Sequence, residues 1–247
     1  MKINWFYFSS PPRFYALAGR LSPLFFALAL LLTTLGLYLG FFVAPTDFQQ
    51  GEGYRIIFVH VPVSWMSMFI YLVIAFWSAM GLVMKTRISM VMAQALVPTG
   101  ALFTFLSLWT GALWGKPMWG AWWVWDARLT SELILLFLYL ALMALRAAID
   151  DERRADRACA LFALVGVVNV PVIYFSVKWW NTLHQGASVS LTRAPSMAST
   201  MLAGMLVMAL AAWAYTIATS LKRARTLLLE REGDSEWARR QFAGDAR

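Results

Sequence analysis

The residues most able to do chemistry are tryptophans gathered in one short stretch. Five of them fall within twelve residues: Trp114, Trp119, Trp122, Trp123 and Trp125. Gly115, Pro117 and Gly120 interrupt the stretch and disfavour a continuous helix through its first half. The i,i+4 spacing of Trp119 and Trp123 and the i,i+3 spacing of Trp122 and Trp125 would align rings on one helical face. Such a segment can present flat indoles to a flat ligand.

An aromatic belt is the alternative explanation for these tryptophans. Indole rings are enriched where a membrane meets water, because the ring is apolar and its N–H needs a polar partner. A belt usually takes about one or two such residues at a helix end, which is fewer than this stretch holds. The density therefore favours ligand binding, and the belt stays open as the simpler interpretation.

The chain has only two histidines, His60 and His184. His60 precedes Val61 and Pro62, and a proline in the first turn suits a helix start, so we expect this imidazole at a membrane surface. His184 follows Trp179 and Trp180 in a polar connection. Either residue alone is typical of a surface or capping histidine, but the pair flanks the tryptophan segment and indicates a binding site.

Two imidazoles suit some metal sites better than others. Structural zinc uses four protein ligands and catalytic zinc usually three, so a histidine pair without cysteines makes a poor zinc site. The same pair can supply both axial ligands of a haem iron, and the porphyrin would gain from stacking on indoles. Its propionates would seek basic side chains. The candidates are Arg55, Lys116, Arg128, Lys178 and Arg193.

Asp126 closes the tryptophan segment and has the wrong charge to bind a propionate directly. Three roles fit its position. It could cap a helix that begins near Leu129, orient Arg128, or bind an indole N–H. The sequence does not choose among them.

Composition indicates the elements that must position these residues. Of the 247 residues, 60% are hydrophobic and 14% are charged. A soluble domain cannot hide that much apolar surface, and apolar runs of about 20 residues recur along the chain. We therefore expect an all-α, polytopic membrane protein. The net charge of +8 comes from basic residues between the apolar runs, which favours membrane topology over nucleic-acid binding.

Six apolar runs are long enough to span a membrane. We expect these spans at about 21–43, 61–84, 91–113, 129–145, 158–177 and 198–219. The first is too long for a signal-peptide core and should remain as a span. Asn169 and Pro171 predict a helix–helix hydrogen bond and a kink in the fifth. Residues 1–220 would form the membrane domain and 221–247 a charged cytoplasmic tail.

The positive-inside rule orients the spans. With both termini in the cytoplasm, 16 of the 21 lysines and arginines lie inside and 5 lie outside. The outer connections are then 44–60, 114–128 and 178–195. The tryptophan segment, residues 114–130, thus shares one face with both histidines.

The sequence lacks the motifs that several activities require. The single cysteine, Cys159, excludes a disulfide framework, and the chain has no C-x-x-C-H for covalent haem attachment. A nucleotide-binding Walker A motif is absent as well. Any haem would be held without thioether bonds, and ATP-driven work would need another chain.

The segment WGKPMWGAWWVWDARLT, residues 114–130, resembles the tryptophan-rich WWD motif of haem-handling membrane proteins. With six spans and a histidine in each flanking outer connection, the whole chain is similar to the CcmC family of cytochrome c maturation. The resemblance implies that His60 and His184 are axial ligands and that the five tryptophans form a haem platform closed by Asp126. No position of the motif departs from the family pattern.

The resemblance also implies a function and partners. Haem b would be a non-covalent, transient cargo at the periplasmic face of a bacterial inner membrane, and it would pass to a membrane-anchored haem chaperone. The other partners would be the membrane and ATPase subunits of an ABC-type transporter and a small single-span subunit. The chain would not itself be an enzyme. Whether it assists the covalent attachment of haem to the chaperone stays open. The alternatives are a haem-translocating permease, a cytochrome c synthase-like haem lyase and a purely structural subunit.

Overall fold

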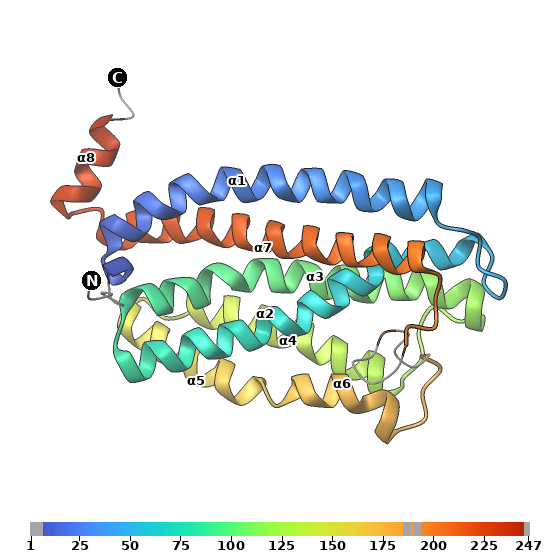
Figure 1. Ribbon diagram of the computed structural model, residues 1–247. Helices are drawn as coiled ribbons and strands as arrows, with labels where there is room; N and C mark the ends of the chain where they lie inside the picture. Colours follow the sequence, from blue (N-terminus) through green and yellow to red (C-terminus); the bar gives the residue numbers. More distant parts are fainter. Residues whose placement is uncertain (1–6, 185–188, 190–193, 245–247) are drawn as a thin grey trace.

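Long helices run back and forth along one axis and form an elongated bundle (Figure 1). The structure is a computed structural model that describes residues 7–184, 189 and 194–244. Its α-helices are α1 (Pro11–Tyr38), α2 (Ile57–Met84), α3 (Arg87–Trp119), α4 (Ala127–Ala147), α5 (Glu152–Gly166), α6 (Asn169–Trp179), α7 (Ser199–Glu232) and α8 (Glu236–Gly244). Three short helices, η1 (Tyr7–Ser9), η2 (Leu39–Val43) and η3 (Glu52–Ile56), precede or follow them.

The prediction of an all-α chain with six spans is confirmed. In the described residues, six helical stretches are long and apolar enough to cross a membrane, and the fifth consists of α5 and α6 together. Large apolar side chains lie on the outside of the bundle: Leu30, Val83 and Val165 are 71%, 75% and 74% exposed. Such a surface suits lipid rather than water. The chain is therefore a multi-pass membrane protein.

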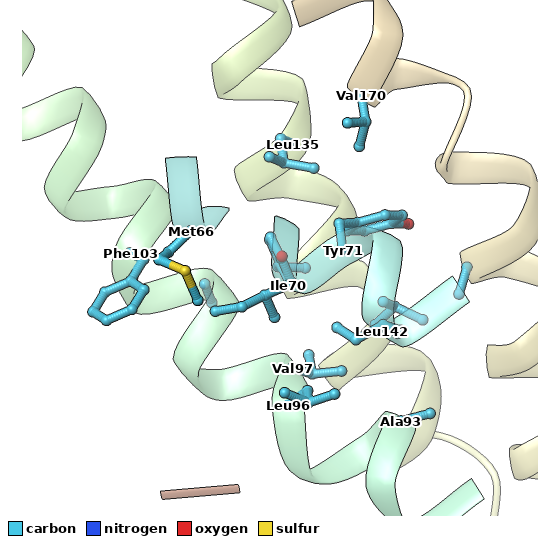
Figure 2. Close-up of a cluster of buried hydrophobic side chains, with 14 of the residues drawn as sticks. Met66, Ile70, Tyr71, Ala93, Leu96, Val97, Phe103, Leu135, Leu142 and Val170 are labelled. Atoms are coloured by element: carbon cyan, nitrogen blue, oxygen red, sulfur yellow. The ribbon is translucent and has the colours of Figure 1, made fainter. Parts of the chain in front are cut away.

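The core lies between α2, α3, α4 and the two halves of the fifth span. Met66 and Ile70 of α2 are 1% exposed, and both belong to one cluster with Leu96 of α3 and Leu135 of α4 (Figure 2). Helix α1 is more peripheral and packs mainly on α7. The helices α2, α3, α4 and α6 are thus packed together through one buried cluster.

The fifth span is broken where the sequence predicts it. The chain turns at Val167 and Val168, between α5 and α6. The Asn169 side-chain amide donates to the Ser131 carbonyl of α4 at 2.9 Å, which confirms the predicted helix–helix hydrogen bond. Pro171 lies in the first turn of α6, where its missing N–H removes no helical bond.

The segment from residue 221 onward differs from the solvated tail that the sequence suggests. Helix α7 continues without interruption to Glu232, and its Leu221, Ala224 and Leu228 are buried. Ala224 and Leu228 pack in one cluster with Tyr15 of α1 and Val91 of α3. The apolar stripe of α7 therefore extends beyond the expected span, and α8 turns away from the bundle axis while its Trp237 still packs against Tyr15 of α1 (Figure 1).

One end of the bundle gathers the segments in which chemistry was expected. There α3 and α6 end, α2 and α4 begin, and the connection between α1 and α2 and the described residues 180–184 after α6 lie close by (Figure 1). We call it the histidine end.

Candidate functional site

The two histidines meet at the histidine end. His60 is the fourth residue of α2 and 7% exposed, and His184 lies half-buried in the connection after α6. Their ring centroids are 6.3 Å apart, with a 37° angle between the ring planes. The prediction that His60 lies in the connection before the helix is wrong. Helix α2 begins at Ile57, directly after η3, and places His60 in its first turn against α3.

His60 is held by the facing turn of α3. Its Nδ1 lies 3.0 Å from the Thr110 hydroxyl oxygen. The ring also lies over Gly111, where an added Cβ would come within 3.1 Å of His60 Cε1. The Trp114 ring approaches it edge-on, with centroids 5.6 Å apart. A glycine one residue beyond the hydroxyl thus allows the imidazole to reach its partner.

His184 is held through Asp126. The backbone N–H of His184 donates to the Thr182 hydroxyl oxygen at 3.0 Å, and that hydroxyl donates to Asp126 Oδ2. The other oxygen, Asp126 Oδ1, accepts the Leu129 N–H at 2.8 Å and caps α4. Of the three roles that the sequence leaves open for Asp126, the structure shows capping. It adds a fourth: Asp126 ties the His184 connection to the start of α4.

The backbone of the tryptophan segment differs from the expected one in both halves. Helix α3 continues through Gly115 and Pro117 to Trp119, so the predicted break there is wrong. A proline removes only one hydrogen bond, and this one lies in the last turn of a long, packed helix. Gly120 ends the helix with φ of +78° and donates its N–H to the Lys116 carbonyl at 3.1 Å.

After Gly120 the chain is not helical again until Ala127. The predicted alignment of Trp119 with Trp123, and of Trp122 with Trp125, on one helical face is therefore wrong. In a non-helical segment the direction of each ring depends on local turns and neighbours rather than on a 3.6-residue period.

Three of the five tryptophans line the smaller cavity described below together with the two histidines. The Trp114 indole N–H donates to Gln50 Oε1 at 2.9 Å, and the Trp119 ring lies 6.4 Å from that of His184. Trp123 lines a cavity with them, and its buried Nε1 has no hydrogen-bond partner among the described residues. Trp122 and Trp125 are 56% and 76% exposed and line neither cavity described below.

Two cavities adjoin the histidine pair. The larger has a volume of about 470 Å³, within the range of small-molecule sites, and extends toward α7, whose Met201 and Met205 line it. The smaller, of about 40 Å³, extends under the tryptophan segment to Glu132. Both are lined by the same five residues: His60, Ser64, Trp114, Arg128 and His184. The two histidines thus lie between a roomy chamber with a mixed polar and apolar lining and a tight aromatic one.

Arg128 is the only lysine or arginine that lines either cavity in the described part of the chain. Its Nη1 donates to the Ile173 carbonyl of α6 at 2.8 Å, which fixes the guanidinium between α4 and α6. A fixed cation at the shared wall of both cavities can bind an anionic group of a ligand.

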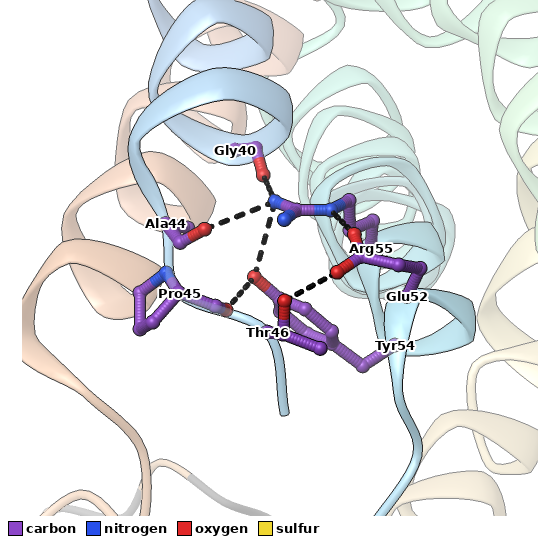
Figure 3. A network of polar contacts seen from close by, with 7 residues as sticks. All are labelled: Gly40, Ala44, Pro45, Thr46, Glu52, Tyr54 and Arg55. Atoms are coloured by element: carbon purple, nitrogen blue, oxygen red, sulfur yellow. Dashed lines mark hydrogen bonds and ion pairs between the residues drawn. The ribbon is translucent and has the colours of Figure 1, made fainter. Parts of the chain in front are cut away.

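The other basic candidates lie elsewhere. Arg55 is bound to the η2 end of α1: it pairs with Glu52, donates to the Gly40 and Ala44 carbonyls and contacts the Tyr54 hydroxyl (Figure 3). Tyr54 in turn lines the larger cavity, so Arg55 supports the cavity wall from behind. Exposed Lys116 donates to Gly120, Lys178 lies over the Phe175 ring, and Arg193 is outside the described residues.

A row of buried polar residues that no sequence motif indicated lies beside the histidines. Ser64 and Ser67 of α2 and Ser107 and Thr110 of α3 are each no more than 8% exposed. The Ser67 hydroxyl oxygen lies 2.7 Å from Glu132 Oε1, and the other carboxyl oxygen of Glu132 has no hydrogen-bond partner among the described residues. Their three-residue spacing inside apolar runs marks one helical face and could have revealed them.

Comparison with known proteins identifies the family. The family described as heme exporter protein C (CcmC) matches residues 4–239. Heme exporter protein C of Haemophilus influenzae is 44% identical over 232 residues, which cover 94% of each chain. That of Escherichia coli is 51% identical over 178 residues, 72% of this chain and 73% of the relative. A ccmC-like mitochondrial cytochrome c biosynthesis protein of Marchantia polymorpha is 53% identical over 159 residues, 64% of this chain and 67% of its own. The chain therefore belongs to the heme exporter protein C (CcmC) family.

Proposed function

We propose that this chain binds haem non-covalently between His60 and His184 and delivers it for the biogenesis of c-type cytochromes. One observation carries the proposal: the only two histidines of a chain in this family lie 6.3 Å apart, centroid to centroid, at the wall shared by two cavities.

The separation of the rings suits a shared metal. Metal–imidazole bonds are about 2.0–2.1 Å long and a ring centre lies about 1 Å further out, so two rings on opposite sides of one metal have centroids about 6 Å apart. Among the described residues, no three His, Cys, Asp or Glu side chains are grouped to hold a metal. A pair of imidazoles without further donors fits the axial positions of haem better than a zinc site.

The surroundings suit the rest of the ligand. Trp114, which lines both cavities, and Trp119 and Trp123, which line the smaller one, offer apolar rings beside the histidines on which the macrocycle would stack. Arg128 supplies a cation for a propionate at the wall that both cavities share. Bis-imidazole ligation leaves no open iron position for oxygen chemistry, so the site supports carrying rather than oxidation.

The two ligands differ in how they are held, which suits a transient cargo. His60 is buried in a helix, whereas His184 lies half-buried on a connection. We propose that the histidine end faces the periplasm of a bacterial inner membrane, with both termini cytoplasmic. The receiving partner is then a membrane-anchored haem chaperone. The membrane and ATPase subunits of an ABC-type transporter and a small single-span subunit complete the assembly.

The test is to purify the full chain without partners and measure its haem by the pyridine haemochrome method and by absorption spectroscopy. We expect about one haem per chain with the spectrum of low-spin, six-coordinate iron. Mixing with the chaperone's periplasmic domain should move the haem to it. A chain that neither retains added haem nor passes it on would overturn the proposal and favour a structural subunit.

The tryptophans provide a separate prediction. Replacing Trp119 with alanine should lower haem retention about tenfold or more, because its ring lies beside His184 and lines the smaller cavity. Replacing Trp125, which is 76% exposed, removes a similar side chain from the same segment and should leave retention within about twofold. Haem dissociation rates measured with an excess of apomyoglobin would compare them. Equal haem dissociation rates for the two variants would show that the tryptophan segment is only an aromatic belt.

A further inference from the structure

The hydroxyl of Thr110 fixes which nitrogen of His60 carries the proton. Thr110 is 8% exposed, and its Oγ1 lies 2.6 Å from the Leu106 carbonyl one turn earlier in α3. A carbonyl only accepts, so the single hydroxyl proton is used in that bond. His60 Nδ1, 3.0 Å from the same Oγ1, must then be the donor.

This assignment decides the tautomer of the ring. A neutral imidazole carries one N–H and one bare nitrogen, so an Nδ1–H leaves the lone pair on Nε2. Metal-binding histidines almost always donate their second ring nitrogen to a neighbouring acceptor, which orients the ring and makes the ligating nitrogen more basic. Thr110 occupies the place of that acceptor.

We propose that Thr110 is a positioning residue for haem: it holds His60 in the tautomer that ligates through Nε2 and strengthens it as a donor. The inference rests on the proposed haem function and names a residue for it. Gly111 completes the arrangement, because the ring reaches Thr110 by lying over a position without a Cβ.

The decisive variant is Thr110→Val, which keeps the size and β-branching of the side chain and removes the acceptor. We expect haem affinity to fall about 10- to 100-fold. The reduction potential of the bound haem should rise, because a less basic imidazole stabilises ferric iron less. Thr110→Ser keeps the hydroxyl and should restore both values.

Thr104 provides a matched control. It is fully buried in the same helix, and its hydroxyl donates to the Gly100 carbonyl at 2.8 Å. Thr104→Val therefore removes a similar helical hydroxyl that has no bond to His60, and it should leave affinity and potential unchanged. If Thr110→Val does not elute as a folded protein in size-exclusion chromatography, the test uses Thr110→Ala instead. That variant removes the same hydrogen-bond acceptor and has a smaller side chain.

The outcomes separate the two proposals. Wild-type affinity and potential in Thr110→Val, in a protein whose low-spin spectrum still depends on His60, would overturn the role of Thr110 alone. A spectrum that is indifferent to both His60→Ala and His184→Ala would overturn haem ligation itself. A loss of affinity that Thr104→Val shares would show only a general cost of removing a buried hydroxyl and would also count against Thr110.

Discussion

Replacing His60 with alanine should abolish the low-spin haem spectrum and lower haem affinity about 100-fold or more, a larger loss than changes in a ligand's neighbours cause. The side chain is 7% exposed and packed between Thr110, Gly111 and Trp114, so its removal leaves a buried gap rather than an open coordination position. Affinity would be measured by titrating haem into the purified, partner-free chain, with size-exclusion elution as the check on folding.

His184→Ala serves as the comparison. It should also lose the low-spin spectrum, but His60 remains, so five-coordinate, high-spin haem should persist at reduced affinity. Added free imidazole should restore the low-spin spectrum more readily here than in His60→Ala, because His184 lies half-buried on a connection. Either variant with the wild-type spectrum and full occupancy would show that the replaced histidine is not a ligand.

The architecture could be predicted because its signals are local. Six long apolar runs are enough to place six spans, and Asn169 followed by Pro171 is enough to predict the break in the fifth. Topology alone also assigned both histidines and the tryptophans to one end of the molecule. Their meeting in the structure follows from that placement, while their role as haem ligands stays a prediction.

The directions of individual side chains could not be predicted, because they depend on neighbours distant in the sequence. Pro117 predicts a break, yet packing keeps α3 helical to Trp119. Beyond that point no helical period applies, so the sequence cannot show that Trp123 lines the cavity while Trp125 is exposed. Arg55 looks like a free outer cation until its bond to Gly40, fifteen residues earlier, is seen.

The sequence also could not predict which polar side chains form hydrogen bonds between helices. Thr110 meets His60 and Ser67 meets Glu132 across 50 and 65 residues of sequence. Inside an apolar run a serine or threonine can also bond to its own helix, as both Thr110 and Ser67 do. The sequence therefore indicates which helical face is polar, but not which hydroxyl serves the site.

Asp126→Ala should lower both the stability of the chain and its haem affinity, because one carboxylate performs two tasks. Loss of the bond from the Leu129 N–H removes the cap of α4, at a cost of about 1 kcal/mol in the free energy of unfolding. Loss of the bond from Thr182 releases the connection that carries His184, so we expect affinity to fall about tenfold or more. Thermal unfolding in detergent and haem titration measure the two effects.

A second capping aspartate separates these effects. Asp151 caps α5 by accepting the Arg154 N–H at 2.7 Å, between α4 and α5, away from the end where α4 begins. Asp151→Ala should cost similar stability and leave haem affinity intact, whereas Thr182→Val should cost affinity with the α4 cap retained. If Asp126→Ala binds haem as tightly as Asp151→Ala, the carboxylate is only a helix cap, and the position of His184 must be set by other contacts.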